Sequence, residues 1–139
     1  MESFERFEDI QAWKSARELM RELYEVTDGE GFAADTPLRD RLRREAATAM
    51  ARIAAGFERC RRTEFIQFLA VAKGSLGELR SYLYVALDRG YITQEELDRL
   101  LAMATETGKV VLDLMRMLRM EFQVGWPEGK DRRRALPSQ

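Results

Sequence analysis

The 139-residue chain contains no histidine, and this absence excludes several kinds of chemistry. Without imidazole there is no Ser–His or Cys–His nucleophile pair and no histidine acting as general acid or base. Di-iron sites of helical bundles that need a Glu-x-x-His motif are excluded in the same way. The sequence offers no other catalytic constellation and no metal-binding motif. We therefore expect a protein that is not an enzyme and that holds no cofactor and no metal.

Cysteine and long apolar runs are also scarce. The single cysteine, Cys60, has no partner for a disulfide within the chain, which fits a reducing cytoplasm. No run of about 18 apolar residues occurs, so we expect no membrane span. Residues 1–13 are acidic and lack the apolar region of a signal peptide. These features predict a cytoplasmic protein that does not enter a membrane. No small-molecule substrate is evident from the sequence.

Neither sign of charge dominates the chain. There are 23 Lys and Arg against 24 Asp and Glu, for a net charge of -1. This balance argues against a strongly basic nucleic-acid-binding domain. The distribution is nevertheless uneven, because acidic residues prevail in 1–37 and basic residues in 38–80. The balanced net charge therefore does not exclude an anionic partner that binds the basic segment 38–80.

Apolar residues recur at three- and four-residue steps, which is the signature of amphipathic helices. Four segments show this period, at about 8–26, 37–58, 63–89 and 94–122. Because the connections are short, we predict an all-α, up-down-up-down antiparallel four-helix bundle. The bundle forms one domain over residues 1–124. Residues 125–139 are basic and have too few apolar residues to fold, so we expect a disordered tail.

Threonines mark the starts of three predicted helices. Thr36 and Thr63 are expected to cap the second and third helices. Thr93 and Glu96 have the spacing of a capping box, which predicts the start of the fourth helix.

The third predicted helix contains the run Lys73-Gly74-Ser75-Leu76-Gly77. A glycine inside a helix destabilises it by roughly 1 kcal/mol relative to alanine, so two glycines indicate a structural requirement at this point of the helix. We expect another helix to come close there, within the subunit or between subunits. The residues expected at close packing or assembly contacts are Gly56, Gly74, Ser75, Gly77 and Glu78. We further expect Glu78 to form an ion pair with Arg44 across helices.

Six arginines are candidate contacts for a partner. They form an N-terminal arginine group (Arg39, Arg43, Arg44) and a C-terminal arginine group (Arg59, Arg61, Arg62). The first group lies in the opening turns of the second helix, where cations oppose the helix dipole and need partners. Two interpretations stay open. The arginines pair with acids such as Glu18, Glu22 and Glu25 of the first helix or with those of a neighbouring subunit, or they bind phosphate.

The second and third predicted helices carry more small and apolar surface than one core requires. The extra apolar face of the third helix consists of Ile66, Val71, Tyr82, Tyr84 and Val85. Unpartnered apolar faces of this kind indicate a subunit interface.

Several motifs together resemble a known family. They are Phe7, Asp9-Ile10, Trp13 and Ala16; Leu38, Leu42, Arg43 and Arg44; Ile53-Ala54-Ala55-Gly56-Phe57; and Glu64-Phe65-Ile66, Phe68-Leu69, Ala72, Gly74-Ser75 and Glu78-Leu79. On these residues the chain resembles the 23S ribosomal RNA intervening-sequence proteins, which are small four-helix bundles. The resemblance covers about residues 4–120. The chain departs from the family pattern at Arg52 and Ala55, where the family usually has Asn and Glu.

The family is similar in fold to the accessory variability proteins of diversity-generating retroelements, which are pentamers that bind nucleic acid and a reverse transcriptase. The resemblance thus implies a homopentamer, with RNA, DNA or a nucleic-acid enzyme as a further partner. Two hypotheses result. The first is a non-enzymatic, homo-oligomeric helical scaffold or interaction protein. The alternative is a nucleic-acid-binding accessory protein that uses the arginine-rich face of the second and third helices.

Overall fold

The computed structural model describes residues 4–123, and this part contains four long helices and no strand. The long helices are α1 (Gln11–Thr27), α2 (Thr36–Glu58), α3 (Arg62–Asp88) and α4 (Gln94–Gln123). Two short 3-10 helices, η1 (Phe7–Asp9) and η2 (Glu30–Ala34), precede α1 and α2. The predicted tail, residues 125–139, lies outside the described residues.

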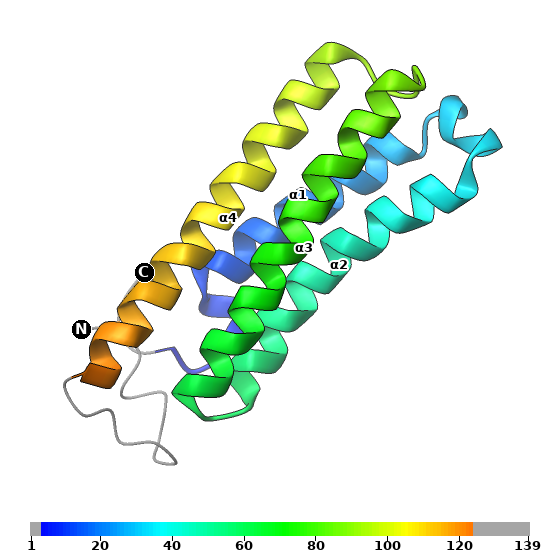
Figure 1. The fold of residues 1–139 in the computed structure, drawn as a ribbon. Coiled ribbons are helices and arrows are strands. Elements are labelled where there is room, and N and C mark those ends of the chain that lie inside the picture. Colours follow the sequence, from blue (N-terminus) through cyan, green and yellow to red (C-terminus); the bar gives the residue numbers. More distant parts are fainter. Residues whose placement is uncertain (1–3, 124–139) are drawn as a thin grey trace.

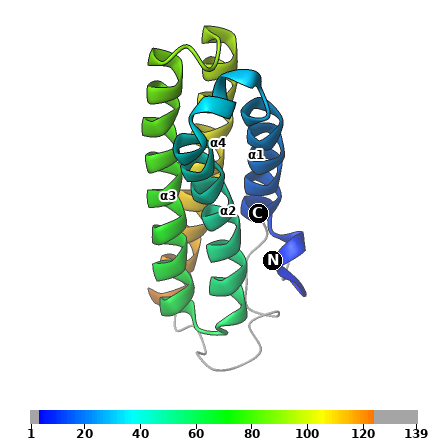
Figure 2. The same cartoon turned by 90° about the vertical axis from the view of Figure 1, so that its right-hand side faces the viewer.

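The four helices form an antiparallel bundle (Figures 1 and 2). Each helix packs against two neighbours, in the cyclic order α1, α2, α3, α4 and back to α1. Residues 59–61 connect α2 to α3, and residues 89–93 connect α3 to α4. Such short connections reverse the chain direction and place successive helices side by side. The all-α four-helix architecture predicted from the periodicity is confirmed for the described residues.

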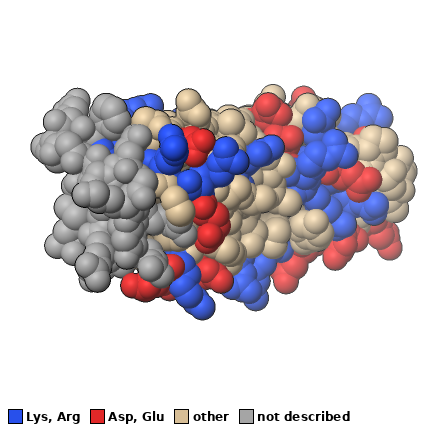
Figure 3. All heavy atoms as spheres, turned by 90° about the horizontal axis from the view of Figure 1, so that it is seen from below, with Lys and Arg blue, Asp and Glu red and all other residues tan. Residues whose placement is uncertain are grey.

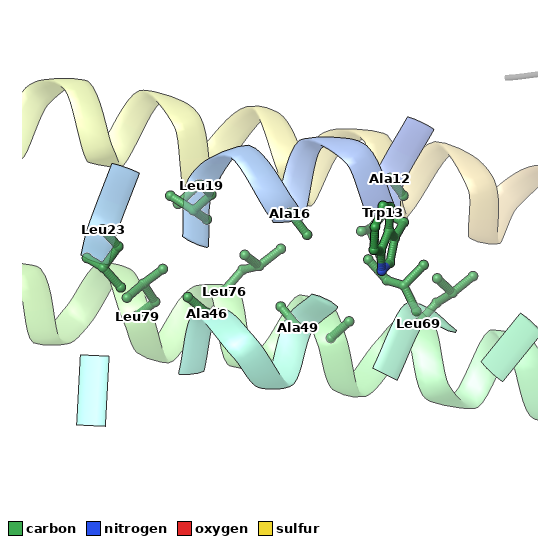
Figure 4. Close-up of a cluster of buried hydrophobic side chains, with 14 of the residues drawn as sticks. Ala12, Trp13, Ala16, Leu19, Leu23, Ala46, Ala49, Leu69, Leu76 and Leu79 are labelled. Atoms are coloured by element: carbon green, nitrogen blue, oxygen red, sulfur yellow. The ribbon is translucent and has the colours of Figure 1, made fainter. Parts of the chain in front are cut away.

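Small side chains lie on the facing sides of the first two helices. Figure 4 shows Ala16 of α1 facing Ala46 and Ala49 of α2, with leucines such as Leu19 and Leu76 filling the space beside them. All five side chains are buried. Fully burying one leucine stabilises the fold by about 1.5–3 kcal/mol, so the leucines supply most of the driving force.

The first helix begins three residues later than predicted. Phe7–Asp9 form η1 instead of the first turn of α1. The ring of Phe7 meets that of Trp13 edge-on at 5.2 Å, and Phe4 is buried. The N-terminal segment therefore packs on the bundle before α1 starts.

Two of the three predicted helix caps are wrong. Asp35 caps α2, because its Oδ1 accepts a hydrogen bond from the Leu38 amide at 3.3 Å, and Thr36 is already helical. The third helix starts at Arg62, so Thr63 lies inside its first turn. Asp35 and Thr36 are both favourable N-cap residues, so propensity alone does not predict which of the two caps α2.

The predicted capping box at the start of α4 is confirmed. Thr93 Oγ1 accepts a hydrogen bond from the Glu96 amide at 3.1 Å. In return, Glu96 Oε1 accepts one from the Thr93 amide at 2.9 Å. This reciprocal pair satisfies two of the free N–H groups at the helix start.

Candidate interaction surface

The two arginine groups lie toward opposite ends of α2. Arg43 and Arg59 are sixteen residues apart in the chain, which corresponds to about 24 Å along a helix. Figure 3 shows positive and negative side chains next to one another on the face it presents, without a wide surface of either sign. The six arginines therefore do not combine into one continuous basic face.

Arg43, in the N-terminal arginine group, fastens α2 to the end of α1. Its Nε donates to Thr27 Oγ1 at 2.8 Å, and one Nη donates to Asp28 Oδ1 at 2.7 Å and to the Tyr24 carbonyl at 3.3 Å. The guanidinium also lies 4.4 Å from the centre of the Tyr24 ring. Since three hydrogen bonds hold it in place, Arg43 contributes to the fold.

Within residues 4–123, no ion pair joins Glu18, Glu22 or Glu25 of the first helix to this group, so that one of the interpretations is wrong for this subunit. Glu22 of α1 lies 2.6 Å from Arg99 of α4, and Glu18 pairs with Arg21 on its own helix. Arg39 pairs with its neighbour Asp40 at 3.3 Å. The acid that meets the group is instead Asp28, the residue that directly follows α1.

The C-terminal arginine group is divided between surface and interior. Arg59 forms an ion pair with Glu64 at 3.2 Å, and Arg61 is exposed. Arg62 is only 1% exposed, so it does not reach the surface in this structure. The three consecutive positions thus have different environments, which the sequence pattern did not distinguish.

Gly56 is the glycine at a close helix contact within the subunit. A Cβ placed on Gly56 would lie 2.8 Å from Phe68 Cβ and 2.9 Å from Phe65 Cδ1. By contrast, a Cβ on Gly74 would meet nothing within 4 Å, and one on Gly77 would meet only the end of the Arg80 side chain at 4.0 Å. Of the two alternatives for Gly74 and Gly77, a close helix of the same subunit is therefore wrong, and a close helix of a neighbouring subunit stays a prediction.

The glycines of α3 belong instead to a solvent-facing surface, which we call the α3 outer face. It consists of Ala70, Val71, Gly74, Gly77, Ser81, Tyr84 and Val85. Val71, Tyr84 and Val85 are 47%, 51% and 43% exposed, respectively. Large apolar side chains at this exposure stand beside glycine and alanine, and the exposed Glu78 lies on the same side of α3.

Two other members of the predicted apolar face are shielded. Tyr82 is half-buried, with the Arg41 guanidinium 5.5 Å from its ring centre, and Ile66 packs against the core. The unpartnered apolar surface is thus smaller than the sequence suggested.

A carboxyl pair joins α2 to α3 beside the α3 outer face. Glu45 is buried, and its side chain is hydrogen-bonded to Glu78. Burial raises the pKa of Glu45, and the hydrogen bond and repulsion from Glu78 act in the same direction. Arg41, whose Nη1 lies 3.9 Å from Glu45, and Arg44 lower that pKa in part.

This pair replaces the predicted ion pair between Glu78 and Arg44, because Glu78 contacts a second carboxyl group. The available signal was the position of Glu45, one residue before the core residue Ala46 and three after Leu42. An acid at that point of the helical period faces inward.

The described residues contain neither a candidate metal cluster nor a membrane-spanning helix. Residues 4–123 contain no group of three or more His, Cys, Asp or Glu placed to hold a metal ion. None of the helices among them has an apolar stretch long enough to cross a membrane.

The chain is similar to known proteins in sequence and in fold. Residues 8–112 match the family described as 23S rRNA-intervening sequence protein. A solved structure from Bacteroides thetaiotaomicron VPI-5482, a protein of unknown function from the S23 ribosomal protein family, superimposes with a TM-score of 0.68 at 17% identity. The match covers 76% of this chain and 98% of that one, and shows the shared fold. No curated protein matches the chain. Because the matched residues span most of its length, the protein belongs to the 23S rRNA-intervening sequence protein family.

Proposed function

We propose that the protein is a non-enzymatic helical scaffold that assembles with copies of itself through the α3 outer face. The observation that carries this proposal is the exposure of Val71, Tyr84 and Val85 around Gly74 and Gly77, where an added Cβ would meet no other helix of the subunit within 4 Å. Each glycine costs the helix roughly 1 kcal/mol. A second helix resting on Gly74 and Gly77 would give that cost a structural reason, because glycine permits close backbone approach.

The size of the surface indicates what else the interface includes. A stable interface buries about 800 Å² on each partner. A helix of the length of α3 is about 40 Å long and about 10–12 Å wide, so its outer face supplies only about half of that area. Side chains of a neighbouring helix must therefore contribute.

The assembly we propose is a closed ring of five copies, as the family resemblance implies. Rings form when one surface of a subunit meets a different surface of the next, and the rotation closes. The α3 outer face would be one of these two surfaces. As a scaffold, such a ring would repeat every surface feature of the subunit around its axis, which strengthens weak binding by multivalency.

Nucleic-acid binding through the two arginine groups is the alternative function, and the geometry favours it less. Arg43 and Arg59 are held by Asp28 and Glu64, and Arg62 is buried. The groups are also separated along α2. The test is a salt titration of binding to a random RNA or DNA. An affinity that does not change with salt, or no binding at low salt, would contradict this alternative.

Sedimentation of the wild type and two matched variants tests self-assembly. Gly74→Leu places a large side chain on the α3 outer face, where nothing lies within 4 Å inside the subunit. Ala102→Leu adds the same side chain at an exposed position on α4. We expect Gly74→Leu to dissociate the oligomer while its far-UV circular dichroism stays helical, and Ala102→Leu to leave the oligomer unchanged. A wild type that is monomeric at tens of micromolar would contradict the proposal.

A further inference from the structure

A groove between α3 and α4 collects three positive side chains. Lys73 and Arg80 line it from α3, and Lys109 lines it from α4. The groove has a volume of about 200 Å³, and no Asp or Glu is among its lining residues. None of the three cations takes part in an ion pair within residues 4–123.

These cations differ in this respect from several arginines elsewhere on the bundle. Arg43, Arg59 and Arg99 each have a carboxylate within 3.2 Å. Where several like charges converge without a counter-charge, their mutual repulsion is relieved when an anion binds between them. The groove therefore has the electrostatic character of an anion site.

A second groove on the same bundle provides a contrast. It lies between α1 and α4, has a volume of about 430 Å³, and is lined by Lys14 together with Glu18 and Glu106. There the single lysine is outnumbered by carboxylates. A positive groove is therefore a local feature of the α3–α4 side and does not result from a surplus of lysine over the whole surface.

The remaining lining residues indicate what kind of anion fits. Thr105 supplies a hydroxyl group, and Leu76 supplies apolar surface. A Cβ on Gly108 would meet nothing within 4 Å, so the absence of a side chain keeps the groove open at that point. Ammonium and guanidinium groups suit phosphate oxygens, and the apolar surface suits the carbon skeleton attached to them.

We propose that the α3–α4 groove binds the phosphate group of a nucleotide. Its volume is below the range of about 300–1,000 Å³ that encloses a drug-sized ligand, so it holds the phosphate and sugar and leaves the base outside. Binding of this kind carries no base preference, because phosphate contacts contain no sequence information. The groove borders the α3 outer face, since a Cβ on Gly77 would lie 4.0 Å from the end of the Arg80 side chain, but the proposal does not rest on self-assembly.

Titration of the full chain with two probes tests the groove and identifies the source of the phosphate. The first probe is AMP, followed by calorimetry. The second is a fluorescently labelled oligouridylate, followed by anisotropy at low ionic strength. Binding of AMP identifies a free nucleotide as the ligand, and binding of the oligouridylate alone identifies a nucleic-acid strand. Either result supports the site if binding of that probe is weaker in the Lys109→Gln variant.

The matched variants are Lys109→Gln in this groove and Lys14→Gln in the α1–α4 groove. Each removes one positive charge from an exposed lysine. We expect Lys109→Gln to weaken binding about fivefold, as befits loss of a partly screened charge contact, and Lys14→Gln to change it less than about twofold. Equal losses in both variants would show attraction to the general charge of the protein and overturn the proposal. Absence of binding for both probes at low ionic strength would overturn it as well.

Discussion

Gly56 of α2 lies so close to Phe68 of α3 that a Cβ on the glycine would be 2.8 Å from the Cβ of the phenylalanine. Phe65 closes the same space from one turn earlier, with Cδ1 at 2.9 Å. Since the Cβ of Phe68 is fixed to the backbone, it has no freedom to move aside. The closest approach of α2 and α3 therefore depends on a glycine at position 56.

We predict that Gly56→Ala destabilises the protein. Overpacking of a core contact costs about 1–3 kcal/mol, which outweighs the gain of up to about 1 kcal/mol in helix propensity. Urea denaturation followed by circular dichroism measures the free energy of unfolding. Gly108→Ala is the control, because nothing lies within 4 Å of its added Cβ. It should stabilise α4 by about 0.5–1 kcal/mol. Equal stabilisation by both substitutions would show that the Gly56 contact accommodates a methyl group.

The helical periodicity of the chain was sufficient to predict the fold class, because the pattern is local to each helix. The start of α4 was predicted for the same reason, since Thr93 and Glu96 are three residues apart. The role of a glycine depends instead on which distant residue faces it. The sequence places both Gly56 and Gly74 inside helices. Their environments differ because Phe68 packs against Gly56, whereas a Cβ on Gly74 would meet nothing within 4 Å.

The environments of the arginines were beyond prediction for a similar reason. Arg43 and Arg44 are adjacent in sequence, but the helical rotation of about 100° per residue directs Arg43 to the end of α1 and leaves Arg44 exposed. Asp28, the acid that pairs with Arg43, directly follows α1 and is therefore not one of the acids within the helix, from which the sequence pattern predicts the ion pairs.

This difference predicts unequal effects of two adjacent substitutions. Arg43→Met removes the hydrogen bonds to Thr27, Asp28 and the Tyr24 carbonyl, and hydrogen bonds to charged groups contribute about 1.5–3 kcal/mol. We expect a loss of stability of that order. Arg44→Met removes an exposed side chain whose charge interacts with Glu45, and it should cost less than about 1 kcal/mol. Thermal melting of both variants measures the difference, and similar melting temperatures would show that Arg43 does not fasten α1 to α2.

A second pair of variants tests the start of α4. Thr93→Ala removes the side chain that accepts the Glu96 amide, so it should cost about 1 kcal/mol. Thr63→Ala removes the same group from an exposed position inside the first turn of α3 and should cost less than about 0.5 kcal/mol. Urea midpoints of the two variants provide the comparison. An equal loss at Thr63 would restore it as a functional helix cap.

The contact between buried Glu45 and exposed Glu78 predicts how stability changes with pH. The pKa of Glu45 is raised above its ordinary value of 4.5 by burial first and by Glu78 second, and Arg41 and Arg44 offset only part of the shift. Between the unfolded and folded pKa values, the folded chain keeps a proton that the unfolded chain has lost. Unfolding then releases a proton, so the Glu45 contribution to stability falls as pH rises through this window, and is independent of pH below it.

Glu45→Gln removes this titration while keeping the shape of the side chain. We expect the variant to be more stable than the wild type at pH 7, and the difference to shrink as pH falls toward 4, where the wild-type carboxyl is protonated in both states. Urea midpoints measured at intervals between pH 4 and pH 7 test this expectation. Glu25→Gln, at an exposed position on α1, controls for the loss of one negative charge. A difference between Glu45→Gln and wild type that stays constant over the whole range would mean that Glu45 titrates alike in the folded and unfolded chains, and that contact with Glu78 does not favour its protonated form.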